Sequence, residues 1–254
     1  MAANKQNTIG ALGTSLRILE ALKLRGSAGV TELSTELELP KSTVYSHLRT
    51  LREHEYVVQQ DDEYCIGLKF LSLGEHTRDR MPIYEVAKPE VNALAEQTGE
   101  LANLLVEEHG EGVYLFRSKG EQAVSLDTHA GMRVKLHCTS LGKAILAYLP
   151  EERVDEIIDR WGLPAQTATT ITTREELEKE FAAIRERGYA HDKGERLSGL
   201  RCVAAPIKNL DGHAIGAVSV AGPTSRMKGE RFESDVPERV MSAANVIELN
   251  LTYS

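Results

Sequence analysis

Residues 39–51, LPKSTVYSHLRTL, decide how the N-terminal part of the chain folds. The pair Leu39-Pro40 ends one helix, because the residue before a proline avoids helical backbone angles. Another helix is predicted over residues 41–53, and one side of its helical wheel carries the apolar residues Val44, Leu48 and Leu51. The other side carries Ser42, Tyr45, Ser46 and Arg49, which contribute little to a core. We therefore expect this helix to pack by one face and to offer the other to a partner.

The flanking segments complete a winged helix-turn-helix pattern. Residues 14–24 have leucines at helical spacing, with Thr14 or Ser15 as the expected N-cap. The next helix is expected to begin at Thr31 as its N-cap and to end at the Leu39-Pro40 stop. After residue 53, EYVVQQDDEYCIGL predicts two short strands around the acidic turn 60–63. Three short helices followed by a hairpin are typical of a winged helix-turn-helix domain.

This arrangement favours DNA binding, since the closing helix of such a motif lies in the major groove. Hydroxyl groups near its N-terminus can reach phosphates, and an arginine can reach a phosphate or a guanine edge. We predict that the groove is faced by Ser42, Thr43, Tyr45, Ser46 and Arg49, and that phosphates are contacted by Thr31 and Lys41. The alternative is an ordinary solvated helix in a small helical subdomain.

The composition allows a DNA-binding protein but does not demand one. The 254 residues carry a formal net charge of −8, and the first 75 hold 8 Lys+Arg against 10 Asp+Glu. This is no basic footprint, so the DNA interpretation rests on local geometry. No apolar run reaches the roughly 18 residues of a membrane helix, and the N-terminus lacks the apolar block of a signal peptide. We expect a cytoplasmic protein whose three separate cysteines are free thiols, because no CxxC pair is present.

The rest of the chain has the pattern of an α+β domain. Residues 68–80 predict a connecting helix, after which segments with strand and helix patterns alternate over about 170 residues. Strands are predicted at 101–108, 111–120, 123–128, 201–209 and 213–222, and helices at 84–98, 141–149, 151–162, 174–188 and 237–253. The last helix is expected to pack on the sheet, although a protein-interaction module that uses it as a dimer face is an alternative.

Three blocks in this order resemble the IclR family of transcription regulators. They are GVTELSTELELPKSTVYSHLRTL with the wing ending in YCIGLKFLSLG, then LHCTSLGKAILAYL, then GYAHDKGERLSGLRCVAAPI followed by GAVSVAGPTSR. The resemblance implies a mostly α winged helix-turn-helix domain (1–67), a linker helix (68–82) and an α+β, GAF-like effector-binding domain with an antiparallel sheet (83–254). It also implies a homodimer or homotetramer on double-stranded operator DNA and a small anionic effector. Repression is the expected mode, although the sequence itself does not separate a repressor from an activator.

The chain departs from the family pattern in three places. Many relatives have a basic residue where Ser46 stands, the wing tip here is acidic, and Gly194-Glu195 replaces two adjacent acidic residues. The acidic tip, Asp61-Asp62-Glu63, weakens the attraction of the wing for phosphates.

A pocket for the effector is expected in the C-terminal domain. Residues 138–142 lie at the start of a predicted helix, and the free backbone N–H groups there would hold an anion. Lys143 is expected to be a solvated residue of that helix. Asp192 favours a hydroxylated acid or a sugar acid, because its carboxylate would repel a plain one. The pocket residues, most of them implied by the resemblance, are Leu126, Cys138, Ser140, Leu141, Asp192, Cys202 and Ser219.

A metal- or thiol-dependent enzyme or sensor is the alternative from another class. It would use His137, Cys138, Asp192 and Cys202, but no pair has the short spacing of zinc motifs and no G-x-S-x-G is present. His137 and Cys138, as neighbours on a strand, would point to opposite faces. We therefore expect no enzyme activity, no metal site and no cofactor.

Overall fold

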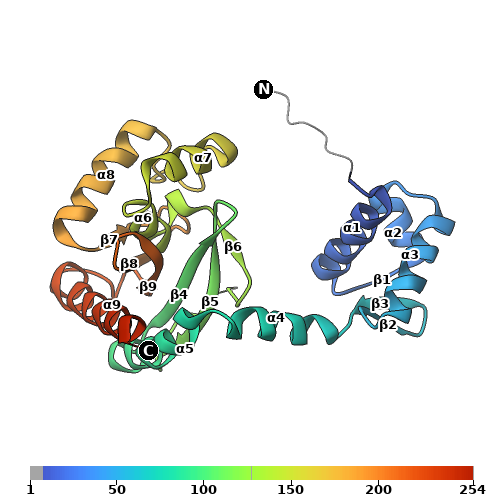
Figure 1. Ribbon diagram of the computed structural model, residues 1–254, viewed down its shortest axis with the longest axis horizontal. Coiled ribbons are helices and arrows are strands. Elements are labelled where there is room, and N and C mark those ends of the chain that lie inside the picture. The colour runs from blue at the N-terminus through green and yellow to red at the C-terminus, as the bar shows by residue number, and fades with distance from the viewer. Residues whose placement is uncertain (1–7, 127, 254) are drawn as a thin grey trace. The chain divides into compact units, whose positions relative to one another are not determined.

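The computed structural model of the chain describes residues 8–126 and 128–253 and divides into two compact units (Figure 1). The first unit ends at Thr77 and the second begins at Arg78. In the described residues, no helix is both long and apolar enough to cross a bilayer.

The first unit is a bundle of three helices with a small three-stranded sheet. Its elements are α1 (Gly10–Arg25), β1 (Ser27–Gly29), α2 (Val30–Leu37), α3 (Lys41–Glu53), β2 (Val57–Gln60), β3 (Glu63–Ile66) and the start of α4 (Lys69–Asp79). Antiparallel pairing gives the strand order β1-β3-β2. The predicted helices and hairpin are confirmed, whereas β1 was not predicted. So short a strand leaves no periodic pattern in the sequence.

Both expected N-caps in this unit are wrong. Helix α1 begins at Gly10, and the Thr14 hydroxyl donates to the Gly10 carbonyl inside the helix, 3.1 Å away. Helix α2 begins at Val30, so Thr31 lies within its first turn. The Glu32 carboxylate accepts the Gly29 N–H at 2.9 Å and so satisfies the backbone donor of the N-cap residue.

The core of the first unit is closed by the apolar faces of its helices. The fully buried side chains are Ile18, Leu22, Leu33, Val44 and Leu48. The predicted buried side of α3 is therefore confirmed for Val44 and Leu48, and Leu51 packs against the same cluster while partly exposed.

The second unit is an antiparallel sheet covered on both faces by helices. Its elements are α5 (Pro82–Thr98), β4 (Leu101–Glu108), β5 (Glu111–Lys119), β6 (Arg133–Val134), a 3-10 turn (Leu136–Cys138), α6 (Ser140–Leu146), α7 (Glu151–Trp161), α8 (Arg174–Arg187), β7 (Ala190–Asp192), β8 (Leu200–Lys208), β9 (Ala214–Pro223), a π-helical turn (Arg231–Asp235) and α9 (Val236–Tyr253). The strand order is β6-β5-β4-β9-β8-β7. This confirms the expected α+β fold with an antiparallel sheet.

Two clusters of apolar side chains fill the two faces of this sheet. Helices α5 and α9 cover one face, and α6 covers the other with α7 and α8 outside it (Figure 1). The last helix therefore packs on the sheet, as expected. Because strand residues alternate between faces, neighbouring residues such as Leu104 and Leu105 belong to different clusters.

The predicted strand over residues 123–128 is wrong. Residues 123–126 and Thr128 are irregular, and Asp127 lies outside the described residues. The chain turns at Gly120, whose N–H donates to the Glu100 carbonyl oxygen at 2.8 Å. This turn explains why the following residues do not continue as a strand. A Cβ atom at Gly120 would lie 2.3 Å from the Ala95 carbonyl oxygen, so only glycine fits this turn.

Candidate DNA-binding face and ligand cavity

The outer face of α3 is open to solvent along its length. Ser42, Tyr45, Ser46 and Arg49 are exposed, with Tyr45 49% exposed, and Thr43 is half-buried. Thr31 and Lys41 are also exposed, on α2 and at the first residue of α3. In the part of the chain that is described, neither Lys41 nor Arg49 forms an ion pair or a side-chain hydrogen bond. Their charges are therefore available to an external partner.

The wing presents acidic rather than basic side chains. Asp61, Asp62 and Glu63 are exposed at the turn between β2 and β3. The Glu63 carboxylate accepts a hydrogen bond from Ser27 on β1 at 2.5 Å, which fixes it along the sheet. The wing tip therefore repels phosphates, and α3 carries the basic groups.

A cavity in the second unit lies between its sheet, α6 and the segment around Thr128. Asn103 on β4 lies opposite Ser219 on β9, while Asp192 on β7 lies opposite Cys202 on β8. All four belong to the sheet face that α6 covers. The space between atoms at this site is about 390 Å³, and part of it is open to solvent.

Six of the seven residues predicted for the pocket line this one cavity. They are Leu126, Ser140, Leu141, Asp192, Cys202 and Ser219. Cys138 is the exception, because the 3-10 turn directs its thiol to the Lys135 carbonyl oxygen, with Sγ and O 3.4 Å apart. The sequence analysis missed Asn103, Tyr114, Thr128 and Arg196, which line the cavity as well. The sequence signal available for one of them was the polar amide of Asn103 within the apolar run LANLLV, residues 101–106.

Asp192 uses its carboxylate to shape the loop that follows it. One oxygen, Oδ1, accepts the backbone N–H groups of Gly194 at 3.0 Å and Glu195 at 2.7 Å. Burial nevertheless raises the pKa of Asp192 to about 6, because a charged carboxylate is poorly solvated there. Asp192 therefore shapes the cavity wall and titrates near neutral pH.

The expected anion cradle at residues 138–142 is only partly open. The Thr139 hydroxyl accepts the Gly142 N–H at 3.0 Å and caps α6 itself. The backbones are also in close contact here, since a Cβ atom at Gly142 would lie 2.1 Å from the Leu136 carbonyl oxygen. The helix start is therefore built for tight packing.

Lys143 is not the solvated residue that the sequence suggested. It is 1% exposed, and its ammonium nitrogen lies 2.6 Å from Glu195 Oε1 and 3.6 Å from Glu180 Oε1. The ion pair joins α6 to the loop after β7, two segments that the sequence places about fifty residues apart. Such a contact between distant segments cannot be found from helical periodicity.

The described residues of this region provide neither a reactive thiol nor a group of metal ligands for the alternative function. Burial raises the pKa of Cys138 to about 11 and that of Cys202 well above its ordinary value, so both remain protonated thiols. His137 lies in the 3-10 turn rather than on the predicted strand, and its Nε2 is 3.0 Å from the Pro164 carbonyl oxygen. Across residues 8–126 and 128–253, no three His, Cys, Asp or Glu side chains are grouped to hold a metal ion.

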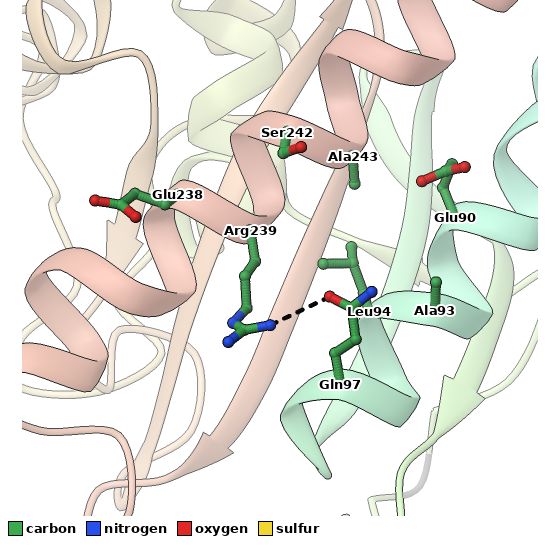
Figure 2. Close-up of a pocket in the computed structure, with 8 residues that line it drawn as sticks. All are labelled: Glu90, Ala93, Leu94, Gln97, Glu238, Arg239, Ser242 and Ala243. Atoms are coloured by element: carbon green, nitrogen blue, oxygen red, sulfur yellow. Dashed lines mark hydrogen bonds between the residues drawn. The ribbon is translucent and has the colours of Figure 1, made fainter.

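A second depression lies on the outer side of α5 and α9 and holds none of the predicted residues. Figure 2 shows Arg239 reaching from α9 toward Gln97 on α5, to whose side-chain oxygen it donates at 3.2 Å. The cavity on the other face is less open to solvent and holds the predicted residues, so it is the better candidate for a ligand site.

A winged helix with an open polar face, joined to an α+β unit with an internal cavity, defines a two-unit DNA-binding regulator. The model of the bacterial transcriptional regulator IclR C-terminal domain matches residues 75–249, and that of the IclR helix-turn-helix domain matches residues 11–61. The chain belongs to the IclR family of transcription regulators.

Similar proteins support the same assignment over nearly the whole chain. The chain is 35% identical to the probable HTH-type transcriptional regulator ArcR of Halobacterium salinarum, covering 93% of this chain and 92% of ArcR. It is 34% identical to the HTH-type transcriptional repressor AllR of Escherichia coli, covering 88% and 84%. The crystal structure of Thermotoga maritima IclR is 30% identical, with a TM-score of 0.81 and coverage of 97% and 100%. The chain is thus a regulator, with a DNA-binding helix-turn-helix and an effector-binding C-terminal domain, and not an enzyme.

Proposed function

We propose that the chain is a sequence-specific repressor that reads its operator with α3 and is controlled by a small anionic metabolite. The observation that carries this proposal is the exposed face of α3, where Arg49 and Lys41 lack partners among the described residues. The repressor AllR, with 34% identity, supports the direction of regulation. The proposed boundaries are residues 1–67 for DNA binding, 68–82 for the linker and 83–254 for effector binding, all acting in the cytoplasm, where the operator lies.

The roles of the residues on this face follow from their positions. Ser42, Thr43, Tyr45, Ser46 and Arg49 face the major groove, while Thr31 and Lys41 bind phosphates. Because the wing tip is acidic, it contributes little to affinity, and α3 supplies the binding energy.

The test uses the full chain and a duplex selected with it from a random-sequence library. Arg49→Ala should weaken binding of that duplex by about 1–3 kcal/mol if the arginine reads a guanine, as measured by fluorescence anisotropy. Lys23→Ala, which removes an exposed cation from α1, is the matched control and should change the affinity little. Equal affinities for wild type and Arg49→Ala would remove Arg49 from the interface.

Tight operator binding requires more than one copy of α3, so we propose a dimer or a dimer of dimers. The apolar side chains Ile9, Leu12 and Leu16 on and beside α1 are 72%, 58% and 55% exposed, and they offer a surface for a second copy. Sedimentation velocity at micromolar concentration should show a dimer or a larger species. Leu12→Glu with Leu16→Glu should shift this species toward monomer, and a wild-type chain that sediments as a monomer would contradict the proposal.

The effector is proposed to occupy the cavity above the sheet. Leu126, Ser140, Leu141 and Cys202 form apolar or neutral walls, while Asp192 and Ser219 supply polar groups that suit a hydroxylated acid or a sugar acid. Residues 68–82 are the covalent route by which ligand binding changes the orientation of the DNA-binding unit. A thermal-shift screen of small carboxylates and sugar acids should identify stabilising compounds, since a ligand that binds only the folded chain raises its melting temperature. Asp192→Ala should alter this response and leave ligand-free DNA binding intact.

A further inference from the structure

Two buried polar atoms in residues that line the ligand cavity have no hydrogen-bond partner among the described residues. The Asn103 side chain is 4% exposed and Thr128 is 7% exposed, and both line the cavity. Asn103 Nδ2 donates to the Ser219 hydroxyl at 3.3 Å, which leaves Asn103 Oδ1 unbonded, and Thr128 Oγ1 is also unbonded. Buried polar atoms nearly always have a hydrogen-bond partner. These two atoms therefore indicate polar groups of a ligand.

Arg196 brings a positive charge to the same cavity. Its only hydrogen-bond contact in the described residues is Met132 Sδ, 3.9 Å from Nη2, and a thioether is a weak acceptor. No carboxylate of the described chain lies within ion-pair distance of its guanidinium. The two nearby acidic groups are engaged elsewhere, because Asp192 Oδ1 binds backbone amides and Glu195 pairs with Lys143.

The loop that carries Arg196 is held firmly on its other sides. Three threonine hydroxyls donate to its carbonyl oxygens: Thr167 and Thr169 to Gly194 at 2.8 and 3.0 Å, and Thr170 to Glu195 at 2.6 Å. Gly194 has a φ of +89°, which a side chain would strain. The backbone at Arg196 is therefore fixed before any ligand binds, which reduces the entropic cost of using its guanidinium.

The long side chain of Arg196 brings its charge toward Asn103, although the two residues lie on distant segments of the sheet and its loops. Ser219, which is bonded to Asn103, lies on β9, while Asp192, which holds the Arg196 loop, lies two strands away on β7. The Arg196 guanidinium, however, reaches past these strands to Met132, whose carbonyl oxygen accepts the Tyr114 N–H of β5 at 3.1 Å, and β5 is the neighbour of β4 and Asn103. The floor between Ser219 and Asp192 carries the apolar or weakly polar side chains Cys202 and Ala221.

We propose that Arg196 is the specificity-determining residue of the cavity, and that the ligand is a hydroxy acid whose carboxylate binds Arg196 and whose hydroxyl donates to Asn103 Oδ1. Asp192 acts as a positioning residue for the Arg196 loop. This inference rests on the proposed effector function of the cavity and names the groups of the ligand that the chain recognises.

The experiment compares three probes that differ in one group each. Lactate has both the carboxylate and the hydroxyl, propionate lacks the hydroxyl, and lactamide lacks the charge. Each is added at up to about 50 mM, at which a Kd of about 5 mM still stabilises the folded chain measurably. For the wild-type chain, thermal-shift titration should rank lactate first, with propionate and lactamide each bound roughly tenfold more weakly.

Variants of the loop separate the inference from the broader proposal. Arg196→Gln should weaken lactate binding roughly 10- to 100-fold and abolish the preference for lactate over lactamide, because the charge-assisted hydrogen bond is lost. Arg196→Lys should restore part of this preference, since it keeps the charge without the planar fork. Lys193→Gln makes the same charge change at an exposed neighbour and should leave all three affinities unchanged.

The outcomes are distinguishable. If the wild-type chain binds lactate and Arg196→Gln keeps the preference for the acid over the amide, the role of Arg196 is wrong while the cavity remains an effector site. If lactamide binds as well as lactate, the ligand class is wrong. If no probe shifts the melting temperature of the wild-type chain at 50 mM, where weak binding registers, the hydroxy-acid site itself is refuted.

Discussion

Replacing Lys143 by methionine should destabilise the second unit strongly, because it leaves a buried carboxylate without its counter-ion. Lys143 Nζ and Glu195 Oε1 are 2.6 Å apart, and their side chains are only 2% and 8% exposed. Burial raises the pKa of Glu195, and the charge of Lys143 opposes that rise. Glu195 Oε2 already lacks a hydrogen-bond partner, so the carboxylate would keep only the backbone hydrogen bond from Lys193.

Removing one partner of a buried ion pair costs about 3–5 kcal/mol. For a domain of this size each kcal/mol lowers the melting temperature by about 2–4 °C, so a decrease of roughly 6–20 °C is expected. The loss should also depend on pH. Without Lys143 the folded-state pKa of Glu195 lies further above its unfolded value, and stability is then lost as the pH rises through that folded-state pKa. The loss of stability caused by Lys143→Met should therefore be larger at pH 8 than at pH 5.

Thermal unfolding of the full chain at these two pH values measures the effect by circular dichroism. The double variant Lys143→Met with Glu195→Gln should recover most of the loss, because no buried charge remains. Lys179→Met is the control, since Lys179 is 71% exposed and its pair with Glu175 on α8 is worth little. A Lys143→Met chain that melts within about 2 °C of the wild type at pH 8 would refute the buried ion pair, since 1 kcal/mol alone shifts melting by that much.

Three further outcomes are expected from the geometry. Gly142→Ala should lower stability by about 1–3 kcal/mol or prevent folding, because its Cβ would lie 2.1 Å from the Leu136 carbonyl oxygen; an unchanged melting temperature would contradict this contact. The pKa of Asp192 is raised from 3.8 to about 6, so its stabilising contribution is complete below pH 3.8 and is lost as the pH rises through 6. In urea titrations the stability of Asp192→Asn relative to the wild type should therefore rise by about 2 kcal/mol between pH 4.5 and pH 7, and a profile like that of the wild type would contradict the shift. Asp62→Lys on the wing should tighten duplex binding and steepen its salt dependence by about one counter-ion; an unchanged slope in anisotropy titrations would place the wing away from DNA.

The sequence predicted features that depend on local periodicity. The wheel of residues 41–53 separated Val44 and Leu48, which are buried, from Arg49, which is exposed. The strands predicted at 101–108, 111–120, 201–209 and 213–222 correspond to β4, β5, β8 and β9 within one residue at each end, because short, mostly apolar runs are bounded by turn residues. These patterns need only a few neighbouring residues, so they can be interpreted without knowledge of the tertiary structure.

What the sequence could not predict depends on partners that are distant along the chain. The burial of Lys143 requires Glu195, and the position of Arg196 requires the threonines at 167–170. The irregular course of residues 123–126 depends on the turn at Gly120, which contacts the Glu100 carbonyl. The resemblance to a family supplied the six cavity residues named in advance, and it could not supply Arg196, which the structure brings to the same cavity.

Coupling between the cavity and the face of α3 is the central claim, and reciprocal titration tests it most directly. The Kd of the selected duplex is measured with and without a saturating acid from the thermal-shift screen, and the Kd of that acid is measured with and without duplex. Linkage requires both constants to change by the same factor, and for a ligand that releases a repressor we expect each binding partner to weaken the other about 5- to 150-fold. A ligand that fills the cavity and leaves the duplex Kd unchanged would contradict the account.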